Sequence, residues 1–166
     1  MKTRKCIILF LLITVIKINA ISAQSADSTV RKAASYFHEA ENASANQKIW
    51  PLKLYGPMMF VDESTRTALA NMADDSGILK PDGEVYKGIL PKSVMIANTA
   101  VTWGGRTWTE VYWPLPSDRD DRVNLMLHEC FHRIQGELNL PARNRTAVHL
   151  SSREGRIYFL LELLSN

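Results

Sequence analysis

Two histidines spaced four residues apart, with a glutamate directly after the first, are the residues of this sequence best suited to chemistry. They are His128, Glu129 and His132, in the segment Leu-His-Glu-Cys-Phe-His. On a helix, side chains at positions i and i+4 project from the same face, one turn apart. Two neutral imidazole nitrogens at that spacing can occupy two corners of a zinc tetrahedron. Glu129 need not be a ligand, and we expect it to accept a proton from a zinc-bound water.

A helix must position these side chains, and the flanking residues predict one. Ser117 is the expected N-cap, and aspartates follow it in the first turn, where the helix dipole favours anions. Gly136 and Pro141 mark the region where the helix ends. Apolar residues recur every three to four positions and predict one buried stripe: Val123, Leu127, Cys130, Ile134 and Leu138. Cys130 is therefore expected to be a small apolar filler of the core rather than a nucleophile.

The segments before this helix are predicted to be rich in strands. We expect a helix at 29–41, short strands within 52–61, 65–72 and 85–90, and a hairpin of 95–103 and 107–113. Gly104-Gly105 gives the hairpin its two-residue turn, because such turns need positive φ. The stretch 74–83 is expected to be loop, and a last helix is expected at 151–164. The predicted class is α+β: a small mixed sheet with a hairpin edge, then the histidine-bearing helix and a C-terminal helix.

Two other features have a plain structural interpretation beside a functional one. His38-Glu39 resembles half of the pattern but has no second histidine at the required spacing, so we expect a solvated helix face. The hairpin tryptophans Trp103, Trp108 and Trp113 favour a core that packs the sheet on the helix. The alternative is that this hairpin is an edge that holds an extended substrate through backbone hydrogen bonds.

The segment at 128–132 resembles the active-site helix of the zincin metallopeptidases. In metzincins a glycine and a third histidine follow, but Gln135 and Leu138 stand at those positions here. In gluzincins, which include the thermolysin-like and zinc aminopeptidase-like enzymes, a glutamate on a following helix is the third ligand. The Glu154-Gly155 pair, 22 residues after His132, is similar to the segment that carries that glutamate. The resemblance spans residues 128–164.

The resemblance implies a zinc ion held by His128, His132 and Glu154, with Glu129 as the general base. His149 and Glu162 are the rival third ligands. Arg133 departs from the family, in which an uncharged residue usually follows the second histidine. The family also uses a later Tyr or His to stabilise the oxyanion, and the substitutes here are Tyr112, His149, Arg156 and Tyr158.

The first 23 residues are predicted to be a secretory signal. Lys2, Arg4 and Lys5 precede an apolar run at 6–16, and small residues up to Ala23 suit cleavage. Removal of 1–23 takes away four basic residues, so 20 Lys and Arg become 16 against 17 Asp and Glu, a net charge of −1. That charge leaves no basic stripe for nucleic acid. Cys130 would then be the remaining cysteine, and one thiol forms no internal disulfide.

Residues 24–166 are expected to form one zincin-like domain, with a C-terminal truncation as an open alternative. The expected function is that of a secreted or periplasmic zinc-dependent peptidase that acts on peptides or proteins, with no membrane partner after signal cleavage. Two alternatives are kept: a zinc- or peptide-binding module without turnover, and a fragment of a longer metalloprotease. The sequence does not indicate the oligomeric state or the substrate.

Overall fold

The computed structural model describes residues 28–140, 152–154 and 157 of the chain. The expected signal at 1–23 and most of the expected last helix at 151–164 lie outside these residues. The chain divides into two units, 1–134 and 135–166, and each is described by itself. Among the described residues, no helix has the length and apolar character that a membrane crossing requires.

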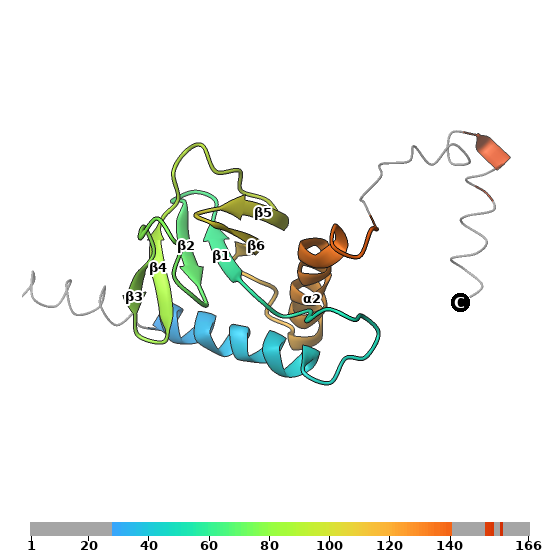
Figure 1. Ribbon diagram of the computed structural model, residues 1–166, viewed down its shortest axis with the longest axis horizontal. Helices are drawn as coiled ribbons and strands as arrows, with labels where there is room; N and C mark the ends of the chain where they lie inside the picture. Colours follow the sequence, from blue (N-terminus) through green and yellow to red (C-terminus); the bar gives the residue numbers. More distant parts are fainter. Residues whose placement is uncertain (1–27, 141–151, 155–156, 158–166) are drawn as a thin grey trace, which may run out of the picture. The chain divides into compact units, whose positions relative to one another are not determined.

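The first unit is built on a six-stranded mixed sheet (Figure 1). Its strands in chain order are β1 (Met58–Asp62), β2 (Thr67–Ala70), β3 (Lys80–Asp82), β4 (Val85–Ile89), β5 (Thr99–Trp103) and β6 (Arg106–Trp113). Their order in the sheet is β3-β4-β2-β1-β6-β5. Neighbouring strands are antiparallel, except that β1 pairs with β6 in parallel. With a helix at 28–44 and the helix α2 (Arg119–Gln135), the fold is mixed α+β, as predicted from the sequence.

The predicted hairpin is confirmed, and β5 forms one edge of the sheet. Gly104 and Gly105 have φ of 54° and 81°, values that side chains with a Cβ rarely adopt. A Cβ on Gly105 would also collide with the carboxylate of Asp75. Both the backbone conformation and the available space therefore require glycine in this turn.

The two faces of the sheet are covered differently. On one face, Phe37 of the 28–44 helix stacks on Phe60 at 4.3 Å between ring centroids, and the Thr109 hydroxyl lies 3.8 Å from the Cys130 sulfur of α2. The opposite face carries an apolar cluster, to which the segment after β4 contributes Leu90 and Val94. Its members are Met59, Val61, Ala68, Ala70, Leu79, Leu90, Val94, Val101 and Trp108. Both helices of the first unit therefore pack on the same side of the sheet.

Three sequence predictions are corrected here. The stretch 74–83 is not all loop, because Lys80–Asp82 forms β3, a short exposed edge strand in which Pro81 is tolerated. Within 52–61, strand structure is confined to β1. Of the three tryptophans, Trp113 packs on the helix side, against Tyr36 and Phe60, whereas Trp108 belongs to the cluster on the opposite face and Trp103 packs against it.

The start of α2 is fixed by Asp118 rather than by the predicted Ser117 cap. One carboxylate oxygen of Asp118 accepts hydrogen bonds from the backbone N–H groups of Asp120 and Asp121, at 2.9 and 3.0 Å. The helix ends at Gln135, directly before Gly136, as predicted. Val123, Cys130 and Ile134 are buried on the expected stripe.

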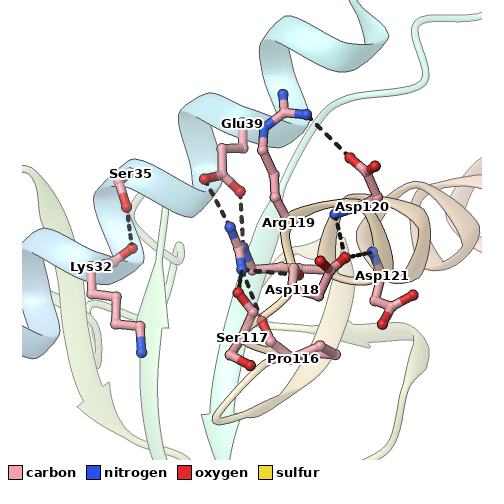
Figure 2. A network of polar contacts seen from close by, with 10 residues as sticks. Lys32, Ser35, Glu39, Pro116, Ser117, Asp118, Arg119, Asp120 and Asp121 are labelled. Atoms are coloured by element: carbon pink, nitrogen blue, oxygen red, sulfur yellow. Dashed lines mark hydrogen bonds and ion pairs between the residues drawn. The ribbon is translucent and has the colours of Figure 1, made fainter.

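An ion pair between the buried Arg122 and the partly buried Glu39 joins the first turn of α2 to the 28–44 helix (Figure 2). The guanidinium of Arg122 donates to both carboxylate oxygens of Glu39, at 2.9 and 3.0 Å, and lies 4.0 Å from the centre of the Tyr36 ring. It also donates to the carbonyls of Pro116, Ser117 and Asp118. Glu39 is thus not part of a merely solvated face. It anchors the helix that carries the two spaced histidines.

Candidate metal centre

One turn of α2 brings the three predicted side chains together. The Nε2 atoms of His128 and His132 lie 3.1 Å apart. One ligand atom from each of His128, Glu129 and His132 lies within 4.8 Å of the others. Two nitrogens bound to one zinc in a tetrahedral site are separated by roughly 3.3 Å, given zinc–nitrogen bonds of about 2.05 Å. The spacing of the two imidazoles therefore suits a shared metal ion.

The same spacing also suits a hydrogen bond between the two rings. If one imidazole carries its proton on Nε2, that nitrogen can donate to the Nε2 of the other ring. The rings meet edge to face, with an angle of 85° between their planes. A metal ion would take the place of that shared proton, so metal binding and ring-to-ring hydrogen bonding are competing states of one pair.

Glu129 differs from the histidines in burial. Glu129 is only 4% exposed to solvent, whereas His128 is an exposed residue. Its Oε2 atom has no hydrogen-bond partner in the part of the chain that the structure describes. Burial raises the pKa of the Glu129 carboxyl, and the two neighbouring imidazoles oppose that shift. A buried carboxylate oxygen without a partner needs a proton, a water or a cation, so the donor set fits a metal site.

Cys130 plays the structural part predicted for it. Its side chain is fully buried against β6, and burial raises the pKa of the thiol to about 11. The thiol is therefore neutral at ordinary pH and is neither an activated nucleophile nor a thiolate ligand.

The third protein ligand remains a prediction. Glu154 belongs to the second unit, where it is helical and exposed. The rival ligands His149 and Glu162 lie outside the described residues, as do Arg156 and Tyr158. The structure thus brings together His128, Glu129 and His132 on one turn of α2.

Tyr112 is not suited to the oxyanion role that the sequence left open for it. Its hydroxyl donates to the carbonyl of Ile96 at 3.0 Å. Alternate residues of β6 face opposite sides of the sheet, and Thr109 faces α2, so Tyr112 faces away from α2. The expectation is corrected: this phenol belongs to the opposite face of the sheet.

Two contacts beside the histidines were not foreseen from the sequence. The Arg133 guanidinium donates to the carbonyls of Lys53 and Leu54, at 3.2 and 2.8 Å. The Trp50 ring lies 4.8 Å from the Phe131 ring. Arg133, a departure from the zincin pattern, therefore ties α2 to the segment before β1. An isolated tryptophan between a helix and a strand gave no signal of this contact.

Comparisons with known proteins add no relative. The sequence matches no protein-family model, and neither a curated protein nor a solved structure was found to be similar to it. Interpretation of the site therefore depends on the geometry of α2 and on the chemistry of its side chains.

Proposed function

We propose that the chain is an exported zinc-dependent peptidase. The observation that carries this proposal is one helical turn in which two imidazole nitrogens lie 3.1 Å apart beside a buried carboxylate with a partnerless oxygen. In the proposed site, His128 and His132 hold the metal from α2, and Glu154 is the third ligand that the zincin resemblance implies. The α+β fold, with strands before the histidine-bearing helix, is compatible with the zincin resemblance of residues 128–164.

Glu129 is the proposed general base. A bound zinc ion would lower the pKa of a water molecule and polarise the peptide carbonyl. Glu129 would accept the proton of the attacking water and pass it to the amine that leaves. Burial raises the pKa of this carboxyl, which makes it a stronger base toward the attacking water.

The proposed substrate is an extended peptide or a protein. β5 lies at the edge of the sheet, and its outer side pairs with no other strand among the described residues. It pairs with β6, the strand whose Thr109 touches α2, so the free edge belongs to the same half of the sheet as the candidate site. Backbone N–H and C=O groups on such an edge can bind an extended peptide as an added strand.

Metal content and hydrolysis test the proposal directly. We expect the exported chain to be purified with about one zinc per molecule by elemental analysis. We also expect it to cleave casein in a reaction that 1,10-phenanthroline stops and added zinc restores. Protein without stoichiometric metal, which also fails to take up zinc, would refute the proposal. Zinc without chelator-sensitive cleavage would replace it with a zinc-binding module that has no turnover.

A further inference from the structure

The segment that joins β4 to β5, residues 90–98, lies over the face of the sheet opposite to α2. Its first half is held by apolar burial, since Leu90 is 1% exposed and Val94 is 7% exposed, and both belong to the cluster on that face. Its second half, residues 95–98, contains no buried residue, and Met95 is 63% exposed. We name residues 95–98 the strap. Because the strap buries little apolar surface, polar contacts must hold it in place.

Arg66 fixes the first half of the segment. Its guanidinium donates hydrogen bonds to the carbonyls of Leu90, Pro91 and Val94, at 3.0, 2.7 and 2.6 Å. A guanidinium is a permanent cation in proteins, so these donors are present at any pH at which the chain is folded. The attachment of residues 90–94 therefore does not depend on pH.

Two residues of β6 hold the strap. The Tyr112 hydroxyl donates to the carbonyl of Ile96 at 3.0 Å, and the Tyr112 backbone N–H donates to the Asn98 side chain at 2.8 Å. Between these contacts, the backbone N–H of Ala97 donates to Oε1 of Glu110 at 2.8 Å. The contact at the centre of the strap thus ends on a group that can gain or lose a proton.

Glu110 is enclosed while the strap is closed. The residue is fully buried, and its Oε2 atom has no hydrogen-bond partner in the part of the chain that the structure describes. Its partners in the strand register, Met59 of β1 and Thr99 of β5, bring no charge. A neutral carboxyl loses much less in such a place than a carboxylate, which needs water or a donor at each oxygen. Burial accordingly raises the pKa of Glu110 to about 7, against the opposing effects of the Ala97 hydrogen bond and the charge of Arg66.

The other ionisable side chains that the described residues place on this side of the sheet have partners or positions of their own. Arg66 is bonded to three carbonyls, and Arg106, at the other end of β6, pairs with Asp75. Tyr86 packs against the apolar cluster, and Lys92 is exposed. Water must therefore reach Glu110 when it ionises, and the strap is the cover that can move most easily to admit it.

We propose that Glu110 makes the strap a pH-sensitive switch. As a neutral acid, Glu110 holds residues 95–98 against β6; once it has released its proton to solvent, the carboxylate takes up water and the strap opens. Residues 90–94 stay attached through Arg66 and through the apolar cluster, so the opening is local. This inference does not depend on the proposed peptidase function, because Glu110 and α2 lie on opposite faces of the sheet.

Hydrogen exchange of single backbone amides, measured by NMR on the full chain from pH 5 to pH 8, tests the switch. After correction for the pH dependence of exchange itself, we expect the opening of the Ala97 amide to increase roughly 10- to 100-fold between pH 5 and pH 7. It should change by less than about threefold from pH 7 to pH 8. The closed form keeps its proton up to a pKa of about 7, whereas the open form has the ordinary value of 4.5.

The Leu90 amide, which donates to the Arg66 carbonyl, is the internal control. At pH 7 it should open at least about tenfold less often than the Ala97 amide, because its half of the segment is released only by wider unfolding. Low concentrations of urea should leave the opening at Ala97 unchanged, since a local opening exposes little surface. Equal opening of the two amides would mean that the segment unfolds as a whole, which would refute the switch.

Two variants separate ionisation from the loss of a contact. Glu110→Gln keeps an acceptor for Ala97 but cannot ionise, so its strap opening should vary by less than about threefold over the whole pH range. Tyr112→Phe removes the hydrogen bond to Ile96, so opening should increase roughly 2- to 10-fold at every pH and keep the pH dependence of the unaltered chain. An unaltered chain whose strap opening is constant with pH would refute the proposal even if Glu110→Gln fails to fold. The same pH dependence in Glu110→Gln would also refute it, because another group would then control the strap.

Discussion

Two buried glutamates, one on α2 and one on β6, resemble each other in burial but differ in what surrounds them. Glu129 is 4% exposed and Glu110 is fully buried. Each has one carboxylate oxygen without a hydrogen-bond partner in the part of the chain that the structure describes. Burial raises the pKa of both carboxyls, and that of Glu110 reaches about 7. By burial and pKa alone, either residue would qualify as a functional acid.

Their neighbours separate the two. Glu129 lies beside two imidazoles whose nitrogens can bind a metal. Glu110 faces the apolar side of the sheet, where its other oxygen accepts a hydrogen bond from the Ala97 backbone N–H at 2.8 Å. Burial raises the pKa of Glu110 more than this hydrogen bond and the charge of Arg66 lower it. A carboxyl with a raised pKa therefore indicates a candidate site only when metal-ligating groups surround it. Without such neighbours, it is a structural group that titrates.

The largest expected effect comes from removing one of the two histidines beside Glu129. His132→Ala takes away one of the two nitrogens that lie 3.1 Å apart, so zinc loses a corner of its coordination. We expect zinc content to fall below about 0.1 per chain and casein hydrolysis to become undetectable. His38→Ala, on the 28–44 helix, is the control and should keep both. Full zinc content in His132→Ala would show that the metal is held elsewhere.

The comparison itself is tested by changing each glutamate to glutamine. Glu129→Gln keeps the shape but removes the base, so hydrolysis should fall by roughly 10²- to 10⁴-fold while zinc is retained. Glu110→Gln, the matched control, should leave zinc content unchanged and hydrolysis within about threefold. Initial rates at saturating substrate distinguish the two. Equal losses in both variants would mean that burial, and not the neighbouring imidazoles, decides function here.

The sequence predicted that Glu129 lies beside two histidines, because this arrangement depends on residue spacing within one helix. The spacing of His128 and His132 is a property of one helix, and the apolar stripe with Gly136 after it predicted that helix. The Gly104-Gly105 turn was predicted for the same reason, since positive φ is a requirement of two adjacent residues. Patterns that act within one turn or one hairpin can be read without knowledge of the fold.

The burial of Glu110 could not be predicted from the sequence, because it depends on which segments pack on each face of the sheet. Glu110 sits in a strand whose other residues gave no indication of which face would be covered. Its burial follows from the apolar cluster and from the 90–98 segment, which pack on that face. Likewise, the contacts Arg122–Glu39 and Trp50–Phe131 join residues 83 and 81 positions apart. The Asp118 cap was not predicted because Ser117 and Asp118 are both favourable N-cap residues, and only the backbone conformation shows which one accepts the hydrogen bonds.

A third acid, the partly buried Glu39, extends the comparison to a carboxylate with a paired guanidinium. Glu39 receives two hydrogen bonds from Arg122, whose guanidinium is largely buried. Arg122→Met leaves Glu39 unpaired and frees the start of α2, so the free energy of unfolding should fall by about 2–4 kcal/mol. Urea denaturation measures this change. Arg119→Met, which breaks the exposed pair with Asp120, should change it by less than about 0.5 kcal/mol. Comparable losses in the two variants would contradict a special role for the Arg122–Glu39 pair.

The smallest expected effect is a pH dependence of stability at Glu110. Because burial raises the pKa of this carboxyl from 4.5 to about 7, the folded chain keeps a proton that the unfolded chain releases between those pH values. The contribution of Glu110 to the free energy of unfolding is therefore fully present below pH 4.5, declines as the pH rises, and levels off above pH 7. We expect the unaltered chain to lose roughly 1–3 kcal/mol relative to Glu110→Gln across this window, since each pKa unit corresponds to about 1.4 kcal/mol. Urea denaturation of both proteins at pH 5, 6, 7 and 8 measures the difference in their free energies of unfolding. Protonation of Glu129 and of the exposed acids affects both proteins equally and cancels in this difference. A difference that stays constant with pH would mean that the carboxyl of Glu110 has the same pKa in the folded and unfolded chain, so that its burial carries no titration.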